Sequence, residues 1–173
     1  MMSLLNVFWL LLIIFATIGG MRGWAKEILV MFSMVLALFL DIIITAYVPG
    51  VSAAIAAQPP IAQFVGRATF FILLAFFGYE TPAVVSALQG KGKREKTQDI
   101  VLGIVIGALN GYLIIGTLWY YLHSAQYPIS GITAPVEPFA QSFINFLPPK
   151  VIGVPYIYFA VGLAFVFVIV VFL

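Results

Sequence analysis

Three ionisable side chains, Asp41, Arg67 and Glu80, lie inside segments of the chain that are otherwise apolar. A charge in apolar surroundings is costly unless a partner neutralises it, so such residues are candidates for an ion pair or for an ion path. Asp41 and Arg67 lie about seven residues from the facing ends of two successive apolar segments, roughly 11 Å deep at about 1.5 Å per residue. We expect them to pair as a structural clasp, and an ion or proton path is the alternative.

Glu80 follows in the motif FFGYETP. It lies roughly 20 Å along a helix from Arg67, which is too far for a contact within that helix. Pro82 could introduce a kink beside it. If the helix ends near Tyr79, Glu80 marks the cytoplasmic interface, and this is the interpretation that we favour.

The sequence shows no group of residues with the types and spacing of a catalytic site. It contains no cysteine, and its single histidine, His123, has no acid, base or nucleophile beside it. The GKGKREK stretch at residues 90–96 lacks the GxxxxGK[ST] spacing of a phosphate-binding loop, and its expected role is in topology and contact with anionic lipid. We therefore expect no enzyme activity, metal or cofactor, and we identify no small-molecule substrate.

The composition explains which elements must position these side chains. Hydrophobic residues make up 64% of the 173 positions and charged residues only 8%, which is outside the range of soluble globular proteins. The lipid bilayer is therefore the expected environment, and the net charge of +2 carries no argument for nucleic acid. The fold class that follows is an all-α polytopic membrane protein.

Five segments are long and apolar enough to cross a bilayer, taking roughly 20 residues per crossing. We read the first as a retained span and not as a signal peptide, because no basic residue precedes it and no small-x-small cleavage pattern follows. The third is long enough to be tilted or broken. The five segments are residues 4–20, 28–48, a part of 60–88, 100–122 and 154–173.

The basic residues predict the orientation, since cytoplasmic loops are enriched in lysine and arginine. Six of the eight lie in two loops, at residues 21–27 and 89–99. These loops should be cytoplasmic, which places the N-terminus outside. The six are Arg22, Lys26, Lys91, Lys93, Arg94 and Lys96.

The chain then divides into a four-helix membrane domain at residues 1–122, a proline-rich external segment at 123–153 and a fifth helix at 154–173. Within the external segment, apolar residues recur at helical spacing between Pro138 and Leu147. This predicts a short amphipathic helix on the membrane surface. Its aromatic residues would pack either on the protein's own rim or on a partner.

A glycine strip lies in the fourth span, where Gly103, Gly107 and Gly111 are four residues apart. Such a strip allows the backbone of another helix to approach closely. The partner is either the first helix of the same chain or a second copy. Asn110 lies in the same stretch, and its amide should face inward and bond across helices.

Two passages carry distinctive motifs. GMRGWAKEILVMF at residues 20–32 contains an RGxxKE core at Arg22, Gly23, Lys26 and Glu27. QDIVLGIVIGALNGYLIIGTLWYYL at residues 98–122 has an acidic residue before LG and then a G-A-L-x-G strip. The first passage resembles the end of the first helix and the start of the second in the colicin V production (CvpA) family, and the second is similar to that family's fourth helix. The chain departs from the family where Asp99 is followed by Ile100, where Asn110 replaces an arginine, and in its fifth helix.

The resemblance implies a bacterial inner-membrane protein linked to colicin V production or export and to envelope homeostasis. It implies no molecular activity. We expect an accessory or scaffold protein whose partners are lipid and other membrane proteins, or copies of itself. A subunit of a larger complex and a small oligomeric channel or transporter are the alternatives.

Overall fold

The computed structural model describes residues 3–79 and 96–172, and the described residues contain helices and no strand. The predicted all-α fold is confirmed. The long helices are α1 (Leu4–Arg22), α2 (Trp24–Tyr47), α4 (Pro60–Tyr79) and α6 (Lys96–Ser124). The shorter elements are α3 (Val51–Ala56), α7 (Pro138–Phe143), the 3-10 turn η1 (Ile144–Phe146), α8 (Pro148–Val151) and α9 (Tyr156–Phe172).

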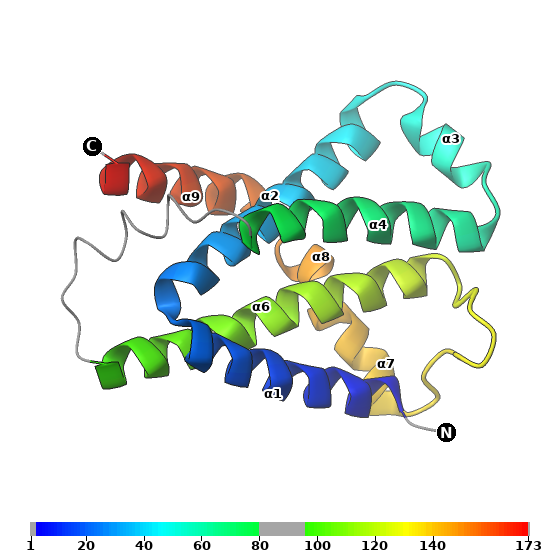
Figure 1. Cartoon of the computed structure of the whole chain (residues 1–173). Coiled ribbons are helices and arrows are strands. Elements are labelled where there is room, and N and C mark those ends of the chain that lie inside the picture. The colour runs from blue at the N-terminus through cyan, green and yellow to red at the C-terminus, as the bar shows by residue number, and fades with distance from the viewer. Residues whose placement is uncertain (1–2, 80–95, 173) are drawn as a thin grey trace.

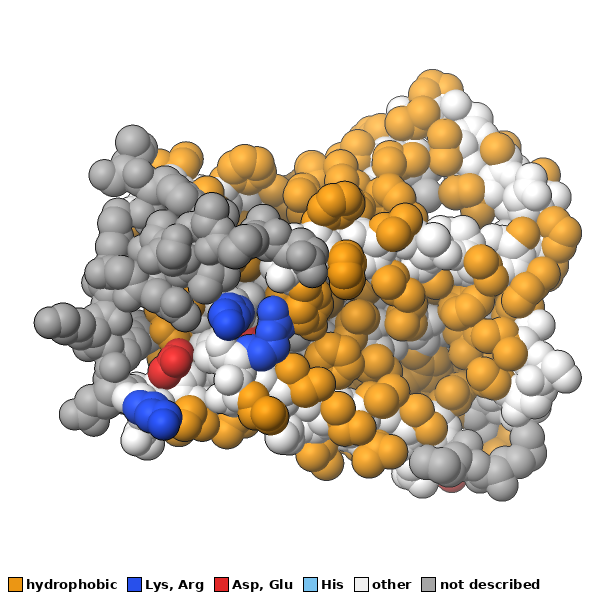
Figure 2. Space-filling model, viewed as in Figure 1, with side chains coloured by type: hydrophobic (Ala, Val, Ile, Leu, Met, Phe, Trp, Pro, Cys, Tyr) orange, Lys and Arg blue, Asp and Glu red, His pale blue; other side chains and the backbone are white. Residues whose placement is uncertain are grey.

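Helices α1 and α6 lie side by side, and α2 runs obliquely to α4 and α6 (Figure 1). Each of the four long helices is long and apolar enough to cross a membrane. Figure 2 shows hydrophobic side chains over most of the visible face, with charged side chains near the end where α1 passes into α2. This distribution fits a bundle whose middle faces hydrocarbon. The expected four-span membrane domain therefore has the helices it needs.

Helix α9 is apolar but has only 17 residues, at the lower limit for a full crossing. It runs antiparallel to α2, because its Tyr158 ring contacts Phe39 while its Phe167 ring contacts Phe32. The Tyr158 hydroxyl also lies 2.9 Å from that of Tyr47, at the end of α2. A fifth membrane crossing stays a prediction.

Helices α1 and α6 pack with their backbones in contact. An added Cβ on Gly103 would collide with the Gly19 carbonyl oxygen, and one on Gly107 would lie 2.6 Å from the Phe15 carbonyl oxygen. Gly111 of α6 faces Phe15 and Leu12 of α1. The strip therefore packs within the chain, on the first helix.

A second interface joins α2, α4 and α6 through an apolar core that includes Val30, Leu38, Phe71 and Tyr121. The Ser33 hydroxyl of α2 lies 2.8 Å from the Val30 carbonyl oxygen and 3.2 Å from the Ala75 carbonyl oxygen of α4. This contact holds α4 close to α2 at the end of the bundle where α1 meets α2.

The proline-rich segment at 123–153 differs from the prediction of a continuous helix at 138–147. Helix α7 ends at Phe143, a 3-10 turn follows, and Leu147 is extended because Pro148 disfavours helical geometry in the residue before it. One face of this segment packs on α1 and α6, with Phe143 5.1 Å from Phe8 between ring centroids. Phe139 and Phe146 stay exposed.

Helix α8 enters the bundle beyond this segment. Pro148 packs on Gly116 of α6, where an added Cβ would lie 2.5 Å from the proline Cδ. The Tyr112 hydroxyl donates to the Phe146 carbonyl oxygen at 2.6 Å. Gly116 lies eight residues before the end of α6, about 12 Å along the helix. The segment therefore packs against the side of α6 and not on its end.

Replacement of Gly107 by leucine should separate α1 from α6, because its side chain would meet backbone atoms that cannot move aside. We expect a loss of about 1–3 kcal/mol or more in the free energy of unfolding. Thermal unfolding of the purified protein in detergent measures this. Gly162→Leu is the matched control, since nothing lies within 4 Å of a Cβ there; equal effects of the two would contradict this packing.

Candidate functional site

Among the described residues, two carboxylates are buried in the bundle, and both belong to α2. Glu27 is 1% exposed and Asp41 is 7% exposed. They are 14 residues apart, which is about 21 Å along the helix. Each carboxylate is paired with an arginine from a neighbouring helix, and we describe them as the Glu27 centre and the Asp41 centre.

The Glu27 centre joins four helices. Arg22 at the end of α1 places Nη1 2.7 Å from Glu27 Oε1, and its guanidinium lies over the Tyr79 ring of α4, 4.3 Å from the centroid. Asn110 of α6 donates from Nδ2 to Glu27 Oε2 at 2.8 Å and to the Glu27 carbonyl oxygen at 2.9 Å. The centre thus satisfies both carboxylate oxygens inside the protein.

The turn beside this centre is tighter than predicted. The expected loop at 21–27 is wrong, because the last turn of α1 and the first turn of α2 occupy these residues and only Gly23 separates them. Gly23 has φ +86°, a backbone conformation that residues with a side chain rarely adopt. A Cβ there would also lie 2.9 Å from the Asp99 carboxylate. Asp99 of α6 accepts a hydrogen bond from the Trp24 backbone N–H at 3.1 Å and so caps α2.

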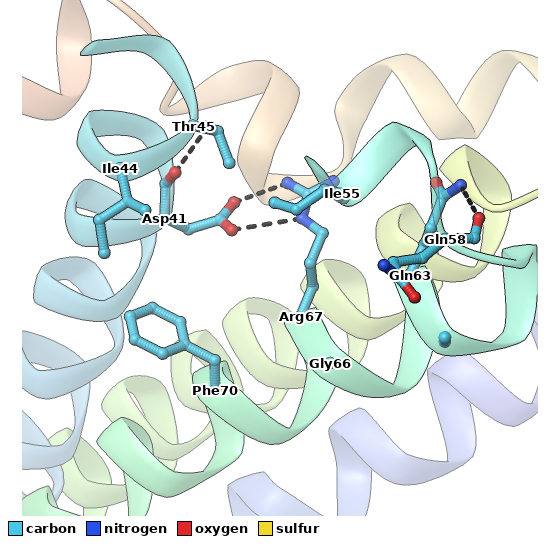
Figure 3. A pocket seen from close by; sticks show the side chains of 10 residues that line it. Asp41, Ile44, Thr45, Ile55, Gln58, Gln63, Gly66, Arg67 and Phe70 are labelled. Atoms are coloured by element: carbon cyan, nitrogen blue, oxygen red, sulfur yellow. Dashed lines mark hydrogen bonds and ion pairs between the residues drawn. The ribbon is translucent and has the colours of Figure 1, made fainter. Parts of the chain in front are cut away.

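The Asp41 centre joins α2 and α4 (Figure 3). Arg67 donates from Nε to Asp41 Oδ1 at 3.2 Å and from Nη2 to Asp41 Oδ2 at 2.6 Å. The guanidinium lies over the Tyr121 ring of α6, 4.2 Å from the centroid. Planar, two-point pairing of this kind is the strongest geometry available to arginine and a carboxylate.

A cavity of about 290 Å³ lies against the Asp41 centre, between α2, α3 and α4, and we call it the α2–α4 cavity. Figure 3 shows Ile44 and Phe70 on one side of the ion pair and Gln58 and Gln63 on the other. An apolar cavity with a few convergent polar groups is the usual form of a small-molecule site. The lining residues are Asp41, Ile44, Thr45, Ile55, Gln58, Ala62, Gln63, Gly66, Arg67 and Phe70.

The remaining sequence candidates lie apart from these centres. Glu80 is outside the described residues. His123 Nδ1 lies 3.2 Å from the Tyr127 hydroxyl, and Lys26 is exposed beside the buried Glu27. Within the described part of the chain, no three His, Cys, Asp or Glu residues are grouped as a metal site requires.

Sequence reasoning missed the burial of Glu27 and its pairing with Arg22 and Asn110. It also missed the Asp99 cap and the two tyrosine rings beneath the arginines. Asp99 carried a signal, as the acidic residue before LG in the family-like passage. Tyr79 and Tyr121 carried none, because each stacks on an arginine of another helix.

Comparison with known proteins gives one match. A family model described as colicin V production protein matches residues 6–132, which run from the third residue of α1 past the end of α6 and include both carboxylate centres and the Asp99 cap. No curated protein and no solved structure matches the chain. Helices α7, α8 and α9 lie beyond the matched range.

Replacement of Glu27 by alanine should leave Arg22 without its carboxylate partner at the junction of four helices and should leave the Asn110 amide with only the backbone carbonyl of residue 27 as acceptor. Removing one partner of a buried pair costs about 3–5 kcal/mol. We expect a comparable loss of stability in thermal unfolding. Lys26→Ala, at the exposed neighbouring position, should leave the unfolding temperature nearly unchanged, and a similar loss in both variants would contradict a buried role of Glu27.

Exchange of Asp41 and Arg67 tests the second pair. Asp41→Arg and Arg67→Asp should each destabilise the protein by about 3–5 kcal/mol, because each leaves two like charges together. The double variant should recover most of this loss, although not the stacking on Tyr121. A double-mutant cycle of unfolding free energies measures the coupling; additive losses would show that the contact contributes nothing.

Proposed function

The chain belongs to the colicin V production protein family, and from this premise we propose that it is a non-enzymatic accessory protein of the bacterial inner membrane. It would assist colicin V production or export, and envelope homeostasis more broadly, by holding other membrane proteins in place. The match covers the whole bundle that contains both carboxylate centres. We propose that the N-terminus faces outside and that the basic residues near Gly23 face the cytoplasm.

The observation that carries this proposal is that the two buried carboxylates of α2 are already paired with side chains inside the bundle. Both oxygens of Glu27 and both oxygens of Asp41 accept hydrogen bonds from side chains of other helices. A conducting or catalytic carboxylate needs access to its ion or substrate. Carboxylates held on both oxygens favour a rigid scaffold.

One observation favours the alternative of a small channel or transporter. Asn110 Oδ1, Thr117 Oγ1 and the Tyr121 hydroxyl are buried and have no hydrogen-bond partner among the described residues. All three belong to α6, where Asn110 lies at the Glu27 centre, Tyr121 at the Asp41 centre and Thr117 between them. Asn110 and Thr117 are about 10 Å apart along the helix, however, which is too far for direct proton transfer.

Gentle extraction from the native membrane, followed by measurement of the particle mass and identification of every chain, tests the proposal. We expect other membrane proteins in a fixed ratio to this chain. Deletion of the chain from a bacterium that makes colicin V should lower the secreted amount, and the wild-type chain should restore it.

A particle that contains only this chain would contradict the accessory role and lead to ion-flux measurements in liposomes. Thr117→Val removes the buried hydroxyl with little change of shape. If the chain conducts, this variant should change the flux. If liposomes with the wild-type chain show no flux above protein-free liposomes, the channel alternative fails.

A further inference from the structure

The Asp41 centre is bordered by two adjoining cavities of different character. The α2–α4 cavity, of about 290 Å³, has mainly apolar walls. A second cavity of about 220 Å³ shares four lining residues with it and adds Ser52 and Ala56 of α3. The four shared residues are Thr45, Ile55, Gln63 and Arg67. Arg67 therefore lies where an apolar space meets a more polar one.

The polar groups at this junction favour a ligand that accepts hydrogen bonds. Asp41 receives Arg67 on both oxygens, so its carboxylate is already occupied. The Thr45 hydroxyl donates to the Asp41 carbonyl oxygen at 2.6 Å. Arg67 uses Nε and Nη2 in the pair and its guanidinium lies over the Tyr121 ring, while no hydrogen bond from its Nη1 is found among the described residues. The side chain is 25% exposed, and guanidinium edges bind carboxylates in two-point geometry.

The apolar part of the site has room for a single hydrocarbon chain but not for a bulky ligand. Ile44, Ala62 and Phe70 line it, and nothing lies within 4 Å of a Cβ built on Gly66. Its volume of about 290 Å³ is close to the lower limit of small-molecule pockets, which is about 300 Å³. The space is too small for a lipid with two chains.

We propose that the α2–α4 cavity binds a single-chain fatty acid, with its carboxylate on Arg67 and its hydrocarbon chain over Gly66 between α2 and α4. This assignment is independent of the accessory function proposed above. The carboxylate of the fatty acid would add a third charged group to the Asp41–Arg67 pair. It would accept hydrogen bonds from the N–H groups of Arg67 that Asp41 does not use. The chain would exchange lipid or detergent contacts for those of Ile44 and Phe70.

Native mass spectrometry of the full chain in detergent tests this directly, with decanoic acid as the probe and 1-decanol as its uncharged counterpart. We expect the acid to bind once per chain and at least tenfold more tightly than the alcohol. Gly66→Leu should weaken binding of the acid at least tenfold by filling the space above Gly66. Gly162→Leu, at a helical glycine in α9 that likewise has nothing within 4 Å of a built Cβ, should bind the acid as the wild type does.

Asp41→Asn gives a second, opposite expectation. It removes the competing carboxylate and leaves Arg67 with an uncompensated charge, so affinity for the acid should rise while affinity for the alcohol stays unchanged. A purely structural role of the cavity would not produce this divergence. If this variant does not fold, the Gly66→Leu comparison decides alone.

Three outcomes would overturn the proposal. Equal binding of acid and alcohol would show that Arg67 does not recognise the head group. Undiminished binding to Gly66→Leu would show that the acid binds elsewhere on the apolar surface. Absence of binding to the wild-type chain would show that the cavity has no such ligand.

Discussion

The cost of burying a charge is the constraint on which this bundle depends. A carboxylate shielded from solvent needs its partner within the protein, because no water can neutralise it. Helix α2 carries two such carboxylates, Glu27 and Asp41, and the other long helices are placed around it to meet them. Arg22 comes from α1, Arg67 from α4 and Asn110 from α6. The polar contacts therefore fix the relative positions of helices that hydrophobic packing alone would leave free to slide.

Close backbone packing supplies the second constraint and is coupled to the first. Gly103 and Gly107 bring α6 against α1, and the same helix carries Asn110 to Glu27 and Asp99 to the turn at Gly23. A bulky residue in the strip would move α6 outward and withdraw both contacts together. Packing and polar satisfaction are thus parts of a single arrangement at this end of the bundle.

The two ends of the bundle differ in a way that bears on function. Around Glu27 the helices are close, and side chains from all four long helices fill the space. Around Asp41, α2 and α4 diverge toward α3 and leave the α2–α4 cavity between them (Figure 1). A rigid end and a more open end in one molecule suit a scaffold that also recognises a small amphiphile. The segments beyond the family match, α7 to α9, add apolar surface to this common core.

The sequence by itself determined the membrane environment, the four long helices, the family and the candidate residues Asp41, Arg67 and Asn110, because hydropathy and the cost of buried charge act locally along the chain. It also indicated Asp99, although not its role. It could not determine that α1 is the partner of the glycine strip, that the turn at Gly23 is capped from α6, or that tyrosine rings support the arginines. Nor could it show a broken external helix or a cavity beside the ion pair. These features depend on how distant segments meet, and only the tertiary structure decides that, because one apolar helix face can pack on many others until specific polar and steric contacts select its neighbour.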